Sequence, residues 1–358
     1  MTASLWNKIW DKLLYKLCRP VPPYAESVSN HIGARTISIG SDHEGLLVPE
    51  CTVWHRYSVA YRATYIARET VKCPDRTAQV YESLRTFPRV RVEGTITTIG
   101  DLWPQNYYHK FVDMVPKLYG LHQEALGHKE ATLVLDERFG EEDLPIVRSL
   151  LPGGVSVQHV RSMRRVECDE YIHLPRLSVP DDRPCKNLSQ IGGLPRDYID
   201  FYRQRLSETF GFSFGQSNPS RRIFISRASA SKRRMINEDE VADVLVELGF
   251  EHVALEDLSP LDQIEMFAEA AIVIGQHGAG LTNLLYVPPG TTVIEIFSSP
   301  DATPPHYSSA TGLLDLDYRA LHMTPAGEEI GRDRDADGVL SIGDLKRELA
   351  DVDKMKAV

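Results

Sequence analysis

The chain has 358 residues, of which 42% are hydrophobic and 25% charged, and its net charge at pH 7 is −10. This length and composition indicate a globular protein with room for two domains. The negative charge argues against a nucleic-acid partner, whose binding site would be basic. The five cysteines are widely spaced and include no CxxC pair, which argues against a zinc site or a disulfide framework and favours a cytoplasmic location.

Residues 1–23 are predicted to form an amphipathic N-terminal helix that ends at a proline-rich stretch. Its apolar side chains recur at helical spacing within residues 5–17, and lysines occupy the other faces. The segment is too short and too charged to span a bilayer, and it lacks the features of a signal peptide. Two interpretations stay open: peripheral contact of residues 5–17 with the inner face of a membrane, or docking on the protein's own surface.

Strand-like and helical segments then alternate through residues 24–195, which predicts an α/β domain. Strands are expected at 36–39, 51–54, 94–99, 131–135, 155–160 and 171–174, and the main helices at 107–120 and 141–151. Residues 196–221 are predicted to be a linker helix and connector. A second α/β domain is predicted at 222–330, with strands at 222–226, 252–255, 271–275 and 292–297, followed by a tail at 331–358. Such alternation favours parallel sheets with helices on both faces and a ligand cleft between the two domains.

Two helices of the second domain have recognisable starts. Asn237 is followed three residues later by Glu240, which is typical of a capping box. Ser259 precedes Pro260, and a hydroxyl cap followed by proline in the first turn is typical of a helix N-terminus.

The most informative segment is residues 271–283, where an apolar strand ends at Gly275, a glycine-rich turn follows and a helix begins at Leu281. A helix that begins just after a strand presents unpaired backbone N–H groups at the positive end of its dipole, which favours an anion. We expect nucleotide phosphate to bind here; the alternative is a plain tight turn. The residues assigned to this site are Gln276, His277, Gly278, Ala279, Gly280, Thr282 and Asn283.

Two further groups lie near strand ends of the same domain. Arg227 follows the strand 222–226, at the edge of a parallel sheet where ligands gather, and Arg233 lies further along the basic loop that ends at Arg234. Guanidinium groups suit a diphosphate, and the alternative is a solvated basic loop. Glu295, in the apolar strand 292–297, is expected to accept hydrogen bonds from ribose hydroxyls or else to lie solvated at an edge.

In the first domain, His109 and Asp113 are four residues apart, so they would share one face of a helix. One of them would serve as a general base and the other as its orienting partner, and the pattern does not say which. The alternative is an ordinary ion pair on the surface.

Residues 333–345 match the pattern of a calcium-binding EF-hand loop. Gly338 takes the sixth position, and Asp344 replaces the usual bidentate glutamate. The predicted ligands of this structural calcium ion are Asp333, Asp335, Asp337, Val339 through its carbonyl, Ser341 and Asp344. The alternative is an acidic turn followed by a short strand and a terminal helix from Ile342.

Four blocks of the chain, taken in order, resemble glycosyltransferase family 61, and specifically its bacterial members in capsule and exopolysaccharide synthesis. The blocks are Asn106-Tyr107-Tyr108-His109 with Asp113 and Pro116, then Ile225-Ser226-Arg227, then Gly275 to Asn283, and Val293-Ile294-Glu295. The third block is the most specific. The family also includes plant xylosyltransferases and animal O-linked N-acetylglucosaminyltransferases.

The resemblance implies a GT-B-like fold of two Rossmann-like domains that face a central cleft. It implies an inverting enzyme that moves a sugar from a UDP-sugar to a hydroxyl of a glycan or lipid-linked oligosaccharide, with no cofactor required for catalysis. Arg227 and the turn around Gly278 would stabilise the leaving diphosphate. His109 or Asp113 would deprotonate the acceptor hydroxyl.

Two other classes of protein fit parts of the sequence. A non-catalytic calcium-dependent or membrane-associated scaffold, with a decayed nucleotide site, would account for the acidic tail and the N-terminal helix. The intact blocks around Arg227 and His277 argue against it. A Rossmann dehydrogenase would need Gly-x-Gly-x-x-Gly, but Gly278 and Gly280 are followed by asparagine at position 283.

Overall fold

The computed structural model describes residues 35–39, 43–54, 59–62, 65–66, 88–100, 105–127, 129–161, 164–178, 189–215, 218–230, 232–300, 303–326 and 336–356. The chain divides into two compact units, residues 1–187 and 188–358. Each unit combines a sheet with helices, so the predicted α/β class is confirmed. The predicted helix over 1–23 lies outside the described residues. Within the ranges above, no helix combines the length and the apolar character needed to cross a bilayer.

The first unit is built on a sheet of nine strands. Its strands are β1 (Arg35–Ile39), β2 (His43–Trp54), β3 (Val59–Arg62), β4 (Tyr65–Ile66), β5 (Arg89–Arg91), β6 (Thr95–Thr98), β7 (Ala131–Asp136), β8 (Val155–Val160) and β9 (Arg165–His173). Its helices are η3 (His109–Met114), η4 (Val115–His122), η5 (Glu124–Leu126), η6 (Glu141–Asp143) and α4 (Leu144–Ser149).

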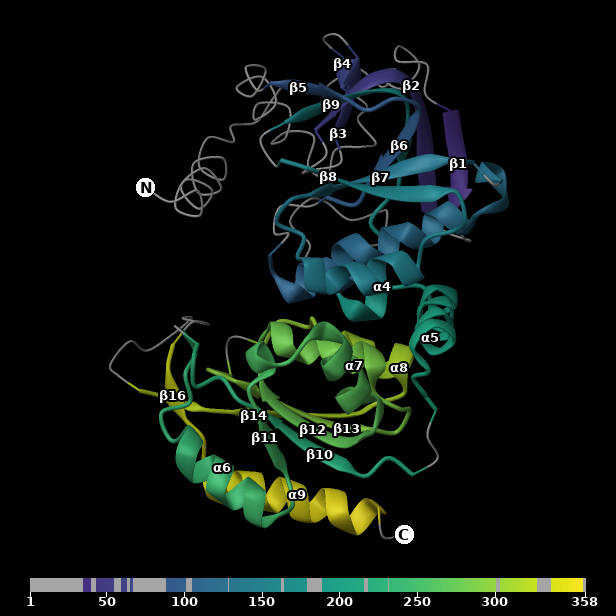
Figure 1. Cartoon of the computed structure of the whole chain (residues 1–358). Helices are drawn as coiled ribbons and strands as arrows, with labels where there is room; N and C mark the ends of the chain where they lie inside the picture. The colour runs from purple at the N-terminus through teal and green to yellow at the C-terminus, as the bar shows by residue number, and fades with distance from the viewer. Residues whose placement is uncertain are drawn as a thin grey trace. The chain divides into compact units, whose positions relative to one another are not determined.

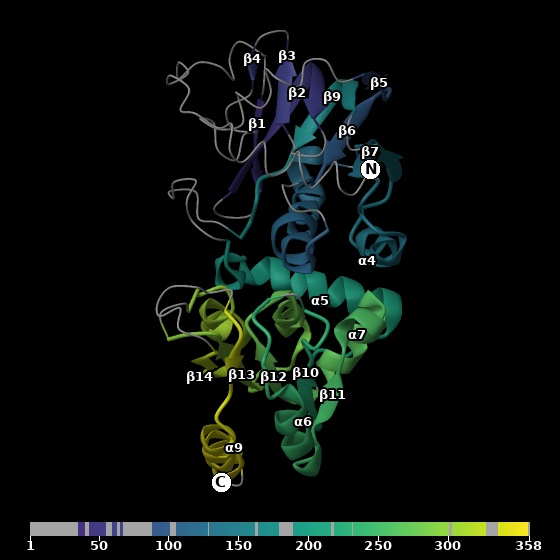
Figure 2. The ribbon, with the colours of Figure 1, turned by 90° about the vertical axis from the view of Figure 1, so that its left-hand side faces the viewer.

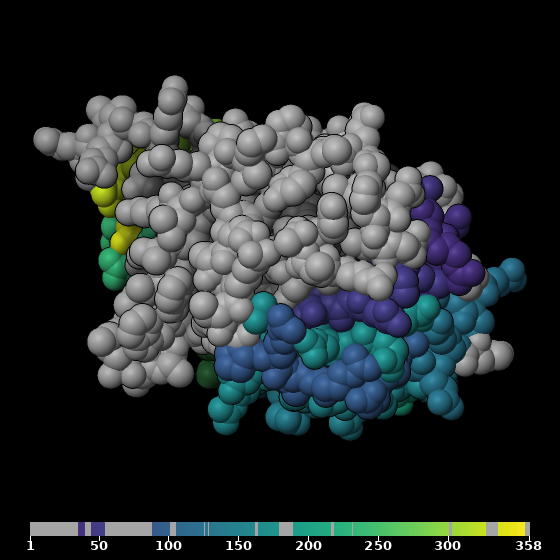
Figure 3. Space-filling model, turned by 90° about the horizontal axis from the view of Figure 1, so that it is seen from above, coloured from purple at the N-terminus to yellow at the C-terminus, as the bar shows by residue number. Residues whose placement is uncertain are grey.

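This sheet is mixed, which differs from the wholly parallel arrangement expected. Strands β6, β7, β8 and β9 pair in parallel, whereas β2 runs antiparallel to β1, β3 and β9. For β1 and β3 the reason is chain length, because the connectors before and after β2 are too short for the crossover that parallel neighbours need. Figure 3 shows the purple N-terminal strands beside blue and teal segments from later in the sequence, as the pairing of β2 with β9 requires.

The predicted α-helix over 107–120 has a different form in the structure. A π-helix, η3, is followed by the 3₁₀-helix η4, and the N–H of Val115 donates to the carbonyl of Lys110, five residues earlier. Pro116 explains part of the change, since it has no N–H to continue an α-helix. Short π-helical turns occur frequently at functional sites.

The second unit is built on a sheet of five strands, and the parallel pairing predicted for it is confirmed. Its strands are β10 (Arg221–Ile225), β11 (Glu251–Val253), β12 (Ala270–Gln276), β13 (Thr292–Phe297) and β14 (Asp317–His322), with a small hairpin-like pair of β15 (Thr324–Pro325) and β16 (Gly338–Val339). Its helices are η7 (Ile191–Gly193), α5 (Arg196–Phe210), α6 (Glu238–Glu247), η8 (Leu255–Asp257), α7 (Pro260–Ala268), η9 (Ala279–Tyr286), η10 (Ser308–Ala310), α8 (Thr311–Leu314) and α9 (Ile342–Lys356).

The strand order of this sheet is β11-β10-β12-β13-β14. Right-handed crossovers then place α6 on one face and α7 on the other, because the chain moves outward from β10 to β11 and back to β12. Figures 1 and 2 show α6 and α9 together on one face of the sheet. Strand β14 was not predicted from the sequence, because it lies at the edge and its side chains are only partly buried.

The apolar side chains of α6 and α9 form one core cluster with the sheet. Val241 and Leu245 of α6 and Leu345 and Leu349 of α9 are all buried there, together with Ile274 of β12. The C-terminal helix is therefore part of the second unit and not a separate appendage.

The segment predicted as a linker, 196–221, also belongs to the second unit. Arg203 of α5 donates two hydrogen bonds to the carbonyl of Leu285, at 3.0 and 2.8 Å, and one to that of Val287 at 3.0 Å. The hydroxyls of Tyr202 and Tyr286 lie 2.9 Å apart. Burial lowers the pKa of Arg203 to about 10. These contacts tie α5 to the end of η9, so the boundary falls before α5.

The two predicted helix starts have different outcomes. Ser259 caps α7 in a capping box, with the N–H of Asp262 donating to its hydroxyl at 3.2 Å, and this prediction is confirmed. The capping box at Asn237 is wrong, since its side chain makes no cap hydrogen bond. The Asn237 amide instead pairs with both backbone groups of Leu340, at 2.9 and 3.0 Å.

Replacing Ser259 with alanine should lower the free energy of unfolding by about 1 kcal/mol, because an N-terminal N–H of α7 loses its acceptor. Chemical denaturation followed by circular dichroism measures the change. Ser207→Ala, inside α5, is the matched control and should not destabilise the protein. Equal destabilisation by both variants would contradict the assignment of the cap.

Candidate functional site

The residues predicted to bind phosphate gather at one point of the second sheet, where the strand order reverses. Strands β10 and β12 are neighbours, but the chain visits the edge strand β11 between them. In sheets of this order, ligands bind outside the carboxyl ends of the two strands at which the connections diverge. Arg227 follows β10 at this place and His277 follows β12.

A buried carboxylate contacts the imidazole ring of His277. Its Nδ1 atom lies 2.5 Å from Oε1 of Glu295, and the Tyr318 hydroxyl donates to Oε2 at 2.6 Å. The side chain of Glu295 is fully buried, whereas that of His277 is 15% exposed. A carboxylate at Nδ1 sets the tautomer of the ring and leaves Nε2 to serve a ligand. The structure thus gives Glu295 a role other than the predicted ribose ligand, because both of its carboxylate oxygens have partners inside the protein.

Aromatic rings fix the plane of this imidazole, and a guanidinium holds the backbone of the same residue. The ring of His277 stacks on Phe297 at 5.4 Å between centroids and on His306 at 5.6 Å. Arg233 donates from Nη1 to the backbone carbonyl of His277 at 2.8 Å. The imidazole is therefore oriented before any ligand arrives.

Arg227 lies directly against the glycine turn. A Cβ atom at Gly278 would clash with Nη1 of Arg227, so a larger residue would displace the guanidinium from this position. The carboxylate of Glu238 accepts hydrogen bonds from the Ser226 hydroxyl at 2.6 Å and from the Arg227 N–H at 3.1 Å. Glu238 thereby fixes the direction in which the chain leaves β10.

The two arginines of the loop repel each other. Burial lowers the pKa of Arg227, and the positive charge of Arg233 lowers it further. The Nε atom of Arg227 is buried and has no hydrogen-bond acceptor among the described residues. Arg233 adopts a left-handed backbone conformation, with φ of 56°, which is uncommon for a residue with a side chain. An anion bound to these guanidiniums would relieve their repulsion and their desolvation.

Several residues predicted as ligands lie behind the turn. Gln276, Thr282 and Asn283 are buried. Gln276 donates to the carbonyl of Arg233 at 3.0 Å, and Asn283 donates to Oε1 of Gln263 in α7 at 2.9 Å. Gln276 and Asn283 thereby hold the shape of the turn. The turn itself enters a 3₁₀-helix at Ala279 and Gly280, two residues earlier than the predicted start at Leu281.

His109 and Asp113 meet in the first unit, as their spacing predicts. The Nδ1 atom of His109 lies 2.6 Å from Oδ2 of Asp113, whose other oxygen accepts from the Ser178 hydroxyl at 2.6 Å. Arg176 lies 3.5 Å from the same oxygen. The Asp113 side chain is fully buried and that of His109 is 26% exposed. The carboxylate is therefore the fixed partner, and the imidazole is the group that a substrate can reach.

Part of the acidic tail lies within the described residues. Asp337 binds the Arg234 guanidinium and backbone N–H, Val339 belongs to β16, and the Ser341 hydroxyl accepts from the N–H of Asp344 at 3.2 Å. Asp333 and Asp335 lie outside the described residues, so the calcium loop stays a prediction. The described portion forms the short strand and the helix from Ile342 that the alternative interpretation predicted.

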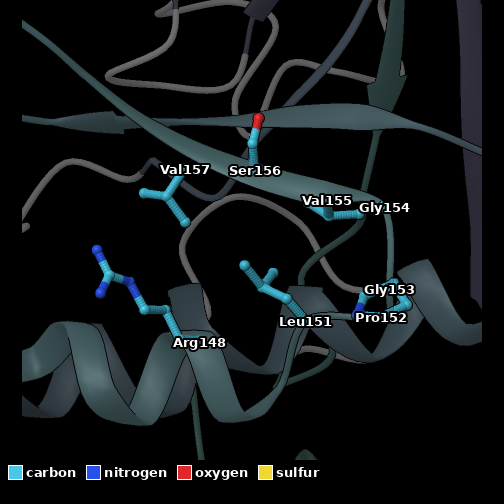
Figure 4. A pocket seen from close by; sticks show the side chains of 8 residues that line it. All are labelled: Arg148, Leu151, Pro152, Gly153, Gly154, Val155, Ser156 and Val157. Carbon is cyan, nitrogen blue, oxygen red and sulfur yellow. The ribbon is translucent and has the colours of Figure 1, made fainter.

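A surface concavity of about 390 Å³ lies in the first unit, between α4 and β8. Figure 4 shows that Arg148 of α4 and the loop before β8 line it. None of the predicted site residues lines this concavity, and it carries no group suited to proton transfer.

The second unit is thus an α/β unit whose switch point places an oriented histidine beside two guanidiniums, an arrangement suited to an anion. Residues 107–294 match the family described as Glycosyltransferase 61. Because this match covers more than half of its residues, the chain belongs to the glycosyltransferase 61 family.

Curated relatives agree with this family. The chain is 27% identical to the β-1,2-xylosyltransferase of Arabidopsis thaliana over 175 residues, which cover 42% of this chain and 33% of the plant protein. It is 27% identical to the protein O-linked-mannose β-1,4-N-acetylglucosaminyltransferase 2 of Mus musculus over 262 residues, 66% of this chain and 44% of that protein. The chain thus spans less than half the length of these relatives. They come from a plant and a mammal, so the narrower bacterial capsular type stays a prediction.

Among solved structures, the E. coli heptosyltransferase WaaC with ADP is similar over 65% of this chain and 94% of that chain, at 11% identity. The TM-score is 0.31, which is too low to establish a shared fold.

Three residues of the site were not predicted from the sequence. Tyr318 binds Glu295 from the unpredicted strand β14, Tyr307 donates to the carbonyl of Gly278 at 2.6 Å, and Glu238 holds the Arg227 turn. Burial is the main cause that raises the pKa of both tyrosines. Of these three residues, only Glu238 could have been suspected from the sequence nearby, since it lies in the first turn of α6, just after the basic loop.

Replacing Tyr318 with phenylalanine should lower the free energy of unfolding by about 1–3 kcal/mol, because a buried carboxylate oxygen of Glu295 loses its donor. Thermal or urea denaturation measures this loss. Glu295→Gln in the Tyr318→Phe background should recover part of it, since the neutral amide costs less to bury. An unchanged free energy of unfolding in Tyr318→Phe would show that the hydroxyl does not stabilise the carboxylate.

Proposed function

We propose that the protein is an inverting glycosyltransferase that moves a sugar from a nucleotide diphosphate sugar to a hydroxyl of a glycan. The observation that supports this most directly is the pair of guanidiniums, Arg227 and Arg233, beside the Gly278 turn at the switch point of a parallel sheet. The relatives add support, because both are named as enzymes that transfer a sugar, xylose in one and N-acetylglucosamine in the other.

The second unit would hold the donor. Negative charge grows on the diphosphate as the bond to the sugar breaks, and preformed cations and backbone N–H groups stabilise that charge most effectively. Arg227, Arg233 and the first N–H groups of η9 would supply this stabilisation. His277, in its protonated form, would donate from Nε2 to a phosphate oxygen while its Nδ1–H donates to Glu295. We expect uridine diphosphate as the nucleotide, from the family resemblance.

The His109–Asp113 pair would activate the acceptor. In a single displacement, the acceptor hydroxyl loses its proton as its oxygen bonds to the anomeric carbon, and the nucleoside diphosphate leaves from the opposite side. His109 would take that proton at Nε2, while Asp113 holds Nδ1 and stabilises the imidazolium that forms. The burial of Asp113 and its contacts with Ser178 and Arg176 suit it to the orienting role.

Calorimetric titration with UDP, GDP, CMP and NAD tests the donor assignment. The wild-type protein should bind UDP best, and Arg227→Met should bind it about 10- to 100-fold more weakly, because a hydrogen bond to a charged group contributes about 1.5–3 kcal/mol. Arg221→Met, at the other end of β10 and paired with Glu251, is the matched control and should keep the wild-type affinity. Absence of nucleotide binding by the wild-type protein would overturn the proposed function.

Replacing His109 with asparagine should reduce the rate of sugar transfer by about 10²- to 10⁴-fold, the usual contribution of a general base. UDP affinity should stay unchanged, because His109 belongs to the first unit and takes no part in the phosphate site. Asp113→Asn should also reduce the rate by changing the tautomer of the ring. His159→Asn, on exposed β8 of the same unit, serves as the control. Full activity of His109→Asn would remove it from the mechanism.

A further inference from the structure

Hydrogen bonds join the segment 337–340 to residues 234–237, where the basic loop ends. The N–H of Gly338 donates to the carbonyl of Arg234 at 3.0 Å, and the carbonyl of Gly338 accepts from the N–H of Ile236 at 2.8 Å. Both backbone groups of Leu340 are taken by the Asn237 amide. The segment 337–340 therefore lies as an extra strand along one side of the end of the basic loop, although it comes 103 residues later in the sequence.

Asp337 provides the side-chain part of this attachment. Its Oδ1 accepts from the backbone N–H of Arg234 at 2.8 Å, and its Oδ2 accepts from the guanidinium of the same residue at 2.9 and 2.6 Å. One carboxylate thus fixes both the main chain and the side chain of Arg234.

The residue immediately before Arg234 is Arg233, which belongs to the proposed phosphate site. Its left-handed backbone turns the chain sharply between the site and the attached strand. Its carbonyl accepts from Gln276 at 3.0 Å and its guanidinium donates to the carbonyl of His277 at 2.8 Å. Arg233 is held on one side by β12 and the turn after it, and on the other by the attachment of Arg234 to Asp337.

The attached strand is itself firmly anchored. A Cβ atom at Gly338 would lie 2.8 Å from Cβ of Met323 and 2.9 Å from the carbonyl oxygen of Thr324, so glycine is needed for the close approach. The helix α9 follows directly, and its buried residues Leu345 and Leu349 lie in the core cluster of the sheet. The hydrogen bonds between Arg234 and Asp337 therefore connect the basic loop to the core of the second unit.

We propose that Asp337 is a positioning residue of the donor site, which acts through Arg234 to hold Arg233 where it binds the diphosphate. This inference rests on the proposed function and extends it to a segment outside the family match at residues 107–294. It also gives the acidic tail a role that requires no metal ion. Loss of the Asp337 carboxylate should release the loop and weaken the contribution of Arg233 to the binding of the donor.

The test compares UDP affinity and transfer kinetics of Asp337→Asn with the wild-type protein in calcium-free buffer. Asp337→Asn should bind UDP about 3- to 30-fold more weakly, within the range of residues that act through a neighbour. It should raise KM for the donor more than it lowers kcat. Asp337→Glu should recover part of the affinity. Asp351→Asn makes the same chemical change in α9, at an exposed pair with Lys354, and should leave UDP affinity unchanged.

A double-mutant cycle separates positioning from a general loss of structure. In an Arg233→Met background, Asp337→Asn should cause no further loss of UDP affinity, because the group that it positions is gone. An equal loss in both backgrounds would overturn the inference, and so would wild-type affinity in the single variant. If the wild-type protein binds no nucleotide, the proposed function fails first and this inference fails with it.

Discussion

The site depends on one constraint, the parallel pairing of β10 with β12 while the chain visits β11 between them. Because right-handed crossovers from these two strands go to opposite faces, their carboxyl ends are the place where loops diverge. The basic loop leaves from one end and the glycine turn from the other, so Arg227 and Gly278 come into contact although 50 residues separate them in the chain. If the register of β10 on β12 were shifted, the guanidiniums and the oriented histidine would no longer lie at the same point of the sheet.

Much of this architecture follows from local patterns in the sequence. The strands β10, β12 and β13 are apolar runs bounded by turn residues, and they were placed to within a residue or two. The helix start at Ser259, with its hydroxyl cap and the proline after it, was placed correctly because its signal is local. The pair of His109 and Asp113 was also found from spacing, although the helix that brings them together is π-helical.

What the sequence did not reveal depends on distant partners. Strand β14 lacks apolar periodicity because it lies at an edge, and Tyr318 could not be linked to Glu295 without it. Asn237 has the right neighbours for a helix cap, yet its amide is used by Leu340, 103 residues away. Glu295 shows the same limit: its place in an apolar strand indicated a special role, but only the fold shows that the role is to orient His277.

The packing of α9 also constrains how the protein is made. The first unit ends by residue 187, so all its strands can pair while the rest of the chain is still being synthesised. The second unit differs, because Leu349 and Val352 complete the core against strands that were finished much earlier. Until those residues have left the ribosome, α6 covers this face of the sheet without α9. Apolar strands are then exposed to chaperones and to neighbouring nascent chains. The two units therefore mature at different times, with the second unit last.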